Sequence, residues 1–188
     1  MRILIIYSYP NHKSLNYSIL KTARDNLKLN NDVKVLDLYQ DNFDPALKFD
    51  QEHPRHLLND DPSTKKYRDL VTWADEIVFI FPIWWAGVPA ILKGFIDRVF
   101  VQGFAYQYEG KRMVGLLKNK KAWIITTCDA PAFSRPFLQD YGKSLQWFVL
   151  KACGFKNVRR DILYSTKNKP RAREKFIKKI ANKSKAIV

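Results

Sequence analysis

Three short segments of the chain carry the residue types that could bind a ligand. The first runs from residue 8 to residue 16 and ends on Ser14, Leu15 and Asn16, where we expect a helix to begin. A helix N-terminus presents unpaired N–H groups and the positive end of the helix dipole, so it suits a phosphate group. Ser14 could equally be no more than the N-cap of that helix, and the residues alone leave both roles open.

The second segment, from Pro82 to Val88, holds two adjacent tryptophans, Trp84 and Trp85. Adjacent side chains diverge, so the two rings cannot easily enter one core, and at least one should face a ligand or a partner chain. A wall made of Pro82, Ile83 and the two rings would suit a flat ligand. A dimer contact or a cap over the core is an equally weighted alternative.

The third segment begins with Thr126, Thr127, Cys128 and Asp129. Its first backbone amides could bond to the polar edge of the same flat ligand. We do not expect Cys128 to be a nucleophile, because no Cys-His-Asn pattern accompanies it.

No metal site and no glycine-rich phosphate loop is expected. His12, His53 and His56 fall in expected loops, without cysteines or carboxylates at ligand spacing. Neither GxGxxG nor GxxxxGK(S/T) occurs, which weighs against the two phosphate-binding loops that those patterns form.

An alternation of strands and helices must position the three segments. Apolar runs predict strands at 2–7, 33–38, 77–81, 122–127 and 158–164, and helical spacing predicts helices at 15–27, 63–74, 89–100, 134–153 and 170–185. This alternation predicts an α/β fold, a flavodoxin-like three-layer sandwich with a five-stranded parallel sheet in the order 2-1-3-4-5. In that order the ligand lies at the carboxyl ends of strands 1 and 3, where the three segments would converge.

The composition bounds the class of protein. With 188 residues we expect a single domain, 1–188. The N-terminus does not resemble a signal peptide, and no apolar run reaches the ~20 residues of a membrane span. The two cysteines form no CxxC pair, so we expect reduced thiols and a cytoplasmic location.

The formal net charge is +15, and much of the excess lies in the C-terminal third. A solvated basic face, the attraction of anionic substrates and nucleic-acid binding would all use such a charge. Because no nucleic-acid-binding motif accompanies it, we do not expect a nucleic-acid partner.

Several stretches resemble a known family. Residues 81–100 read FPIWWAGVPAILKGFIDRVF and residues 103–108 read GFAYQY, with supporting matches NHKSLN at 11–16, NFDP at 42–45 and CGF at 153–155. These stretches resemble the NAD(P)H:quinone oxidoreductases, flavodoxin-like flavoproteins that include relatives of general stress protein 14. The resemblance spans nearly the whole chain.

The resemblance implies an enzyme that transfers hydride from NAD(P)H through flavin N5 to a quinone-like acceptor by a ping-pong mechanism, as a homodimer. The implied cofactor is FMN, with FAD as the alternative, because little chain follows the fifth strand to hold an adenine. The implied cofactor-binding residues are Tyr9, His12, Ser14, Leu15, Asn16, Pro82, Ile83, Trp84, Trp85, Thr126, Thr127 and Cys128. Tyr106 and Tyr108 resemble the tyrosines of a substrate pocket at the dimer interface, with no side-chain nucleophile.

Two departures from the family pattern bear on the site. Tyr9-Pro10 stands where the family usually has His-Pro, so a histidine contact to the flavin phosphates is missing or comes from His12. Cys128-Asp129 stands where Gly-Gly is usual, which restricts the backbone and brings a carboxylate near the flavin. Either Asp129 points away or the reduction potential falls.

The main alternative is a flavin-binding regulatory subunit of a potassium-efflux system without significant turnover of its own. In that case the basic C-terminal helix would dock the chain peripherally on a membrane protein.

Overall fold

Five strands form a parallel sheet in this computed structural model, which describes residues 1–52, 54–134, 142–167 and 169–188. They are β1 (Arg2–Tyr7), β2 (Asp32–Asp37), β3 (Glu76–Pro82), β6 (Lys121–Thr127) and β7 (Val158–Leu163). The order is β2-β1-β3-β6-β7, so the expected fold class and strand order are confirmed.

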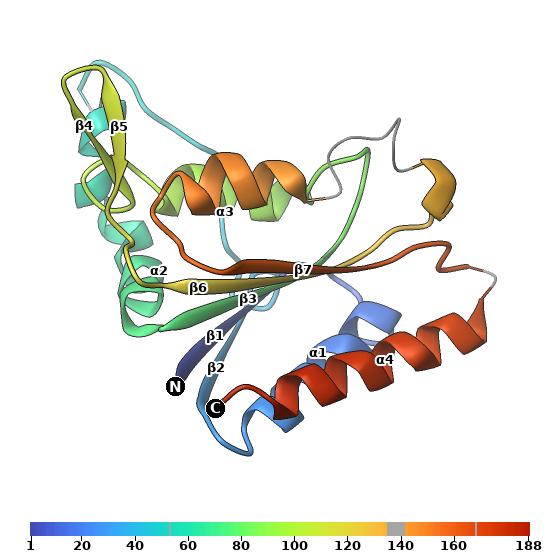
Figure 1. The fold of residues 1–188 in the computed structure, drawn as a ribbon. Coiled ribbons are helices and arrows are strands. Elements are labelled where there is room, and N and C mark those ends of the chain that lie inside the picture. Colours follow the sequence, from blue (N-terminus) through green and yellow to red (C-terminus); the bar gives the residue numbers. More distant parts are fainter. Residues whose placement is uncertain (53, 135–141, 168) are drawn as a thin grey trace.

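Helices cover both faces of the sheet (Figure 1). One face carries α1 (Leu15–Leu27) and α4 (Pro170–Lys185), and the other carries α2 (Pro62–Trp73), α3 (Ala90–Val99) and a short π-helix, η3 (Leu145–Lys151). Every residue of β3 is buried, as expected for a central parallel strand with both faces covered. Successive side chains of a strand alternate between two hydrophobic cores: Leu4 and Ile6 enter one, and Ile3 and Ile5 enter the other.

A buried carboxylate fastens α4 to the sheet. Asp161 of β7 accepts a hydrogen bond from Trp123 Nε1 at 2.8 Å, and it pairs with Lys179 at 2.7 Å and Lys183 at 2.8 Å. Burial by itself would raise the pKa of Asp161, but these hydrogen bonds outweigh it and hold the pKa below its usual range. Part of the basic charge of α4 is therefore structural.

The helix expected at 134–153 differs from the structure where it can be compared. Residues 135–141, with Leu138 and Tyr141, lie outside the described residues, and residues 145–151 form a π-helix. A π-helix bonds residue i to residue i+5, so Leu145 and Leu150 share the buried side. An α-helix over these residues would place Phe148 on the same face as Leu145, but the π-helical winding leaves its ring exposed.

A hairpin and two short 3-10 helices were not predicted. Residues 106–109 and 112–115 form an antiparallel hairpin, β4 (Tyr106–Glu109) and β5 (Arg112–Gly115), and the polar segment before α2 contains a 3-10 helix, η1 (Arg55–Asp60). A second 3-10 turn, η2, spans Ala132–Ser134. These elements are short and mostly exposed, so they lack the apolar periodicity that predicts longer ones.

The segment before η1 is held against α3 by a close backbone contact and an arginine. A Cβ on Gly94 would lie 2.2 Å from the carbonyl oxygen of Pro45, so only glycine fits there. One turn on, Arg98 donates to the Asp44 carbonyl at 2.6 Å and to Asp61 and Ser63 at 3.2 and 2.8 Å. These contacts fix both ends of the segment that carries η1.

Replacing Asp161 by asparagine should remove the attraction to two lysines while leaving an acceptor for Trp123. We expect Asp161→Asn to lower the free energy of unfolding by about 2 kcal/mol at pH 7, as for other charge-assisted hydrogen bonds. Because the folded-state pKa is lowered, this contribution is complete above the unfolded value near ~4 and is lost as the pH falls through the folded value. Urea unfolding at pH 7, 5 and 3 measures it.

The matched control is Asp25→Asn, which removes an exposed carboxylate that pairs with Arg24. We expect it to change stability by less than about 0.5 kcal/mol. An equal loss in both variants, or a gap between Asp161→Asn and the wild type that persists at pH 3, would contradict the role assigned to Asp161.

Alanine at Gly94 tests the close contact with Pro45. Helix propensity alone predicts a gain of about 1 kcal/mol for Gly94→Ala. The overlap with the Pro45 backbone predicts instead a net loss of about 1–3 kcal/mol in the free energy of unfolding. Gly87→Ala is the control, because its Cβ would meet nothing nearer than 3.7 Å and should cost little. Stabilisation by Gly94→Ala would show that α3 and Pro45 are not so closely packed.

Candidate functional site

The three segments singled out from the sequence meet at the carboxyl ends of β1, β3 and β6. Thr127 Oγ1 donates to Asn16 Oδ1 at 3.2 Å, joining the third segment to the first. The amide of Ile83 donates to the Thr127 carbonyl at 2.8 Å, joining the second to the third. The rings of Tyr9 and Trp84 lie 5.8 Å apart, joining the first to the second. We call residues 8–16, 82–88 and 126–129 the cradle.

The helix N-terminus in the cradle is capped by Ser14. Ser14 has an extended backbone, and its hydroxyl accepts a hydrogen bond from the Tyr17 amide at 3.1 Å. The capping role left open by the sequence is thus confirmed. The amides of Leu15 and Asn16 belong to the first helical turn and have no intrahelical acceptor, so they remain suited to an anion.

His12 is tied to β2. Its Nε2 lies 2.7 Å from Asp37 Oδ2, and its ring packs against Tyr17 with centroids 4.8 Å apart. One ring nitrogen is thus already engaged, which limits what His12 can offer to a phosphate. Beside it, burial raises the pKa of Tyr7 to about 12, so this phenol stays neutral.

The two tryptophans lie on a tight left-handed turn. Trp84 and Gly87 exchange backbone hydrogen bonds of 3.1 and 2.9 Å, and Trp85 and Ala86 between them have φ values of 50° and 59°. Two such residues are typical of a type I′ turn, and they are costly without glycine, as is often seen at functional sites. Trp84 is 42% exposed and Trp85 is fully exposed, so the core-cap alternative is wrong. A ligand or a partner chain remains.

The third segment is bound to the strand beside it. The amide of Cys128 donates to the Leu163 carbonyl at 2.8 Å and is therefore already used, and its side chain is buried. Asp129 is hydrogen-bonded by the side chain of Lys167 at 2.7 Å and by its amide at 3.0 Å, and these bonds lower the pKa of Asp129. The carboxylate that replaces a family glycine is thus paired with a cation.

Two buried hydroxyls at the cradle favour a polar ligand. Ser8 Oγ and Thr126 Oγ1 are fully buried and lack a hydrogen-bond partner within the described part of the chain. A buried hydroxyl without a partner costs about 1–3 kcal/mol, which a ligand with polar edges could recover. Together with the free first-turn amides and the exposed tryptophans, these groups fit a flat ring that carries a phosphate.

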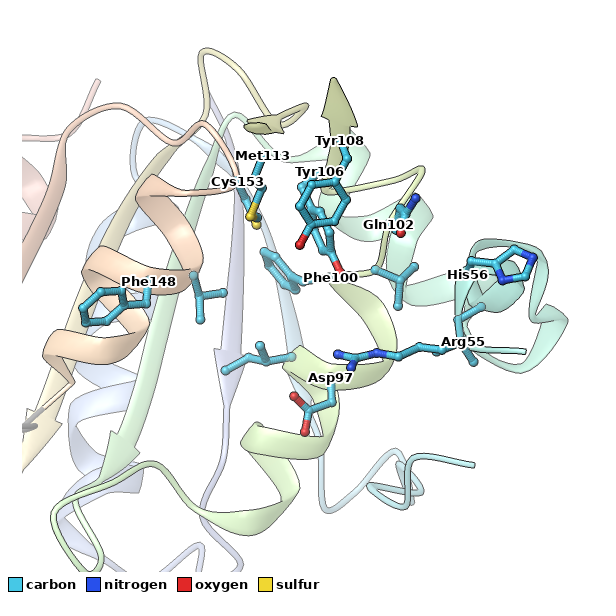
Figure 2. Close-up of a pocket in the computed structure, with 14 residues that line it drawn as sticks. Arg55, His56, Asp97, Phe100, Gln102, Tyr106, Tyr108, Met113, Phe148 and Cys153 are labelled. Carbon is cyan, nitrogen blue, oxygen red and sulfur yellow. The ribbon is translucent and has the colours of Figure 1, made fainter. Parts of the chain in front are cut away.

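A separate pocket of about 460 Å³ contains the two predicted substrate tyrosines. Tyr106 and Tyr108 stand on the hairpin with their rings 5.9 Å apart and nearly perpendicular, as Figure 2 shows. The other lining residues are Arg55, His56, Leu58, Ile96, Asp97, Phe100, Val101, Gln102, Met113, Phe148, Val149 and Cys153. Burial raises the pKa of Tyr106, and the nearby charge of Arg55 opposes that rise.

This pocket and the cradle lie at opposite ends of α3. The helix begins after the tryptophan turn and ends beside the hairpin, and its ten residues span about 15 Å (Figure 1). The structure therefore does not bring Tyr106 and Tyr108 to the cofactor-binding residues predicted from the sequence within one chain.

Sequence reasoning missed most of the pocket, including Arg55, Asp97, Phe100 and Gln102. They come from η1, α3 and the turn before the hairpin, and no spacing in the sequence connects them. The one available signal was the unusual length of the polar segment that contains η1.

Within the described ranges, no helix is both long and apolar enough to cross a membrane. The same ranges contain no group of three or more histidine, cysteine or acidic side chains that could hold a metal ion. His53 lies outside them.

Comparisons with known proteins agree with this architecture. The family model described as "Flavodoxin-like fold" matches residues 1–188. The chain is 38% identical over 125 residues to an uncharacterized NAD(P)H oxidoreductase of Haemophilus influenzae, a match that covers 64% of this chain and 61% of that protein. It is 30% identical over 193 residues to NAD(P)H dehydrogenase (quinone) 1 of Rattus norvegicus, covering 90% of this chain and 70% of that enzyme.

Solved structures extend the likeness. The crystal structure of Smu.1420 from Streptococcus mutans is 49% identical with a TM-score of 0.97, and the match covers the whole of both chains. An FMN-dependent NADH-azoreductase from Bacillus anthracis, solved with FMN, has a TM-score of 0.78 over 99% of this chain and 98% of its own, at 14% identity. That last likeness shows a shared fold alone. From the family model and the relatives, the chain belongs to the NAD(P)H:quinone oxidoreductases of flavodoxin-like fold.

Proposed function

We propose that this chain binds FMN in the cradle and transfers hydride from NAD(P)H to a quinone-like acceptor. The observation that carries the proposal is the meeting at one edge of the sheet of first-turn helix amides without an intrahelical acceptor, an exposed aromatic turn and two buried hydroxyls that have no partner within the described residues. In a doubly wound sheet this edge, between β1 and β3, is the position at which ligands bind.

Each part of the cradle suits a different part of FMN. The first-turn amides at Leu15 and Asn16, with the capped helix behind them, would hold the phosphate. The turn at Trp84 and Trp85 would line the ring system, and the Thr127 end of β6 would face its polar edge. The bound flavin would supply the chemistry of accepting and returning a hydride, which no side chain of the chain can do.

A second copy of the chain would complete the site. Tyr106 and Tyr108 lie beyond the far end of α3 from the cradle, so they could approach a cofactor there only from another subunit (Figure 1). Large apolar side chains that a monomer would leave in water, such as Trp85 and Phe148, are available for such an interface. We therefore propose a homodimer with two equivalent sites.

The pocket residues would hold the acceptor and exclude water. The Tyr106 phenol is protonated at neutral pH, and burial raises its pKa further, so it can donate a hydrogen bond to a quinone oxygen. The aromatic lining displaces water from the reacting face. Donor and acceptor would use this space in turn, which is the order of a ping-pong mechanism.

The regulatory-subunit alternative gains no specific support from α4. Two of the lysines of its basic helix, Lys179 and Lys183, are engaged by Asp161 and hold the helix to the sheet.

An absorbance spectrum of the purified protein from about 300 to 550 nm, before and after adding FMN, FAD and NADPH, tests the proposal, because the flavin would carry the redox chemistry. We expect a bound flavin band that bleaches with NADPH and recovers when menadione is added. Failure to bind either flavin would contradict the proposal. A band that bleaches but does not recover would favour the regulatory alternative.

The variant Ser14→Asp separates the capping role of Ser14 from phosphate binding. Aspartate is as good an N-cap as serine, so we expect stability within about 0.5 kcal/mol of the wild type. Its negative charge beside a bound phosphate should weaken FMN binding by roughly tenfold or more, equivalent to about 1.4 kcal/mol. Fluorescence titration with FMN and urea unfolding measure the two effects.

Ser18→Asp is the matched control, because it adds the same charge one turn along α1 on an exposed side chain. We expect the control to bind FMN nearly as the wild type does. Equal affinity in Ser14→Asp and the wild type would show that the phosphate is not held at this helix.

A further inference from the structure

We infer that the tyrosine pocket prefers an aromatic acceptor that carries a negative charge, and that Arg55 recognises that charge. The inference rests on the proposed function, because it names the class of acceptor for the same reaction. It is carried by an uncompensated cation at the rim of an aromatic cavity.

Among the described residues that line the pocket, Arg55 is the one that carries a permanent positive charge. Figure 2 shows its guanidinium extending inward from the rim opposite the hairpin, whereas the ring of His56 points away. Within the described residues, Arg55 has no ion pair. The charge of Arg55 lies near enough to the Tyr106 phenol to oppose the rise in its pKa that burial causes.

The one carboxylate that lines the pocket does not cancel this charge. Asp97 lies near Arg55 in Figure 2, but both of its oxygens are contacted by Lys93 Nζ, at 2.5 and 2.6 Å. The Asp97–Lys93 pair is nearly neutral, so the guanidinium remains available. A planar guanidinium binds a carboxylate or a sulfonate through two parallel hydrogen bonds.

The other residues that line the pocket indicate which kind of ligand should carry the negative charge. Phe100, Tyr106, Tyr108 and Met113 present ring faces and a thioether, which suit aromatic rings. A volume of about 460 Å³ lies within the usual range for small-molecule pockets and admits a compound of two or three fused rings.

The position of Arg55 is fixed by the fold. It opens η1, in which the Leu57 amide donates to the Pro54 carbonyl at 2.9 Å and Leu58 is buried. Arg98 then clamps the ends of this segment through Asp44 and Asp61. The guanidinium is thus carried on an anchored turn.

The 2′-phosphate of NADPH is a second source of negative charge. The pocket's size and aromatic lining favour a charged acceptor over the nucleotide phosphate as the group that Arg55 binds. The experiment must distinguish these two ligands.

Binding of two inert probes tests the inference without any turnover. Naphthalene-2-sulfonate and naphthalene-2-methanol share a ring system and differ in charge, and ligand-observed NMR gives their dissociation constants for the purified full chain. We expect Arg55→Gln to weaken binding of the sulfonate by about tenfold, in line with loss of a charge-assisted hydrogen bond. We expect it to change the dissociation constant of the alcohol by less than twofold. Arg171→Gln removes the same charge from the exposed start of α4 and should change neither.

Turnover provides the second measurement. With 1,4-naphthoquinone-2-sulfonate and 1,4-naphthoquinone as acceptors, we expect Arg55→Gln to lower the ratio of their kcat/KM values by about tenfold. An unchanged ratio together with a higher KM for NADPH, but not for NADH, would assign Arg55 to the nucleotide phosphate and overturn the inference.

The two proposals fail in different ways. Equal binding of both probes by the wild type and Arg55→Gln, or the same loss in Arg171→Gln, would overturn the acceptor class even if flavin is reduced by NADPH. Absence of a flavin band would reject the proposed function, while selective loss of the sulfonate probe would still support the anion site at Arg55.

Discussion

β1 pairs in parallel with β2 on one side and with β3 on the other, and this placement decides where a ligand can lie. Because the chain leaves β1 in one direction and later returns to the other side of it, α1 and α2 cover opposite faces of the sheet (Figure 1). At the carboxyl edge of the sheet, the loop after β1 therefore leads to a helix on one face and the loop after β3 leads to a helix on the other face. The hydrogen bonds of Thr127 to Asn16 and Ile83 then draw the loop after β6 into the same place.

The distribution of charge follows from the same frame. A formal charge of +15 suggests a partner that is a polyanion, but several of the basic side chains have structural tasks. Lys179 and Lys183 neutralise Asp161 beneath α4, and Arg98 anchors the segment that carries η1. Arg55 stands apart because it lines the tyrosine pocket without an ion-pair partner among the described residues, which leaves its guanidinium available to an anionic ligand.

How far the sequence predicts this protein depends on the length of each element. The five sheet strands and the helices α1, α2, α3 and α4 were predicted within a residue or two, since buried parallel strands and amphipathic helices leave strong periodic patterns, but the helix expected at 134–153 was not. The hairpin left none, because its strands have four residues each and are largely exposed, although Gly110 between two such stretches hints at its turn. The exposure of Phe148 could not be predicted, because a π-helix replaces the 3.6-residue period with a longer one.

The candidate site shows the same division. The convergence of the cradle follows from strand order, so Ser14, Trp84 and Thr127 could be placed together in advance. The pairing of Asp129 with Lys167 and the use of the Cys128 amide depend on the path of the chain after β7, which no motif encodes. The pocket around Arg55 depends on three separate elements meeting at the end of α3, and only a three-dimensional structure reveals it.

Hydrogen–deuterium exchange of the backbone amides, measured with and without FMN, tests the central claim that the cradle is the flavin site. The account predicts slower exchange with FMN at Leu15 and Asn16 and across the turn from Trp84 to Gly87, because a bound ligand would cover these amides. Little change is expected along α4, which packs against α1 and β7 and contributes no residue to the cradle. Protection confined to α4 or to η1, or none at saturating FMN, would contradict the account.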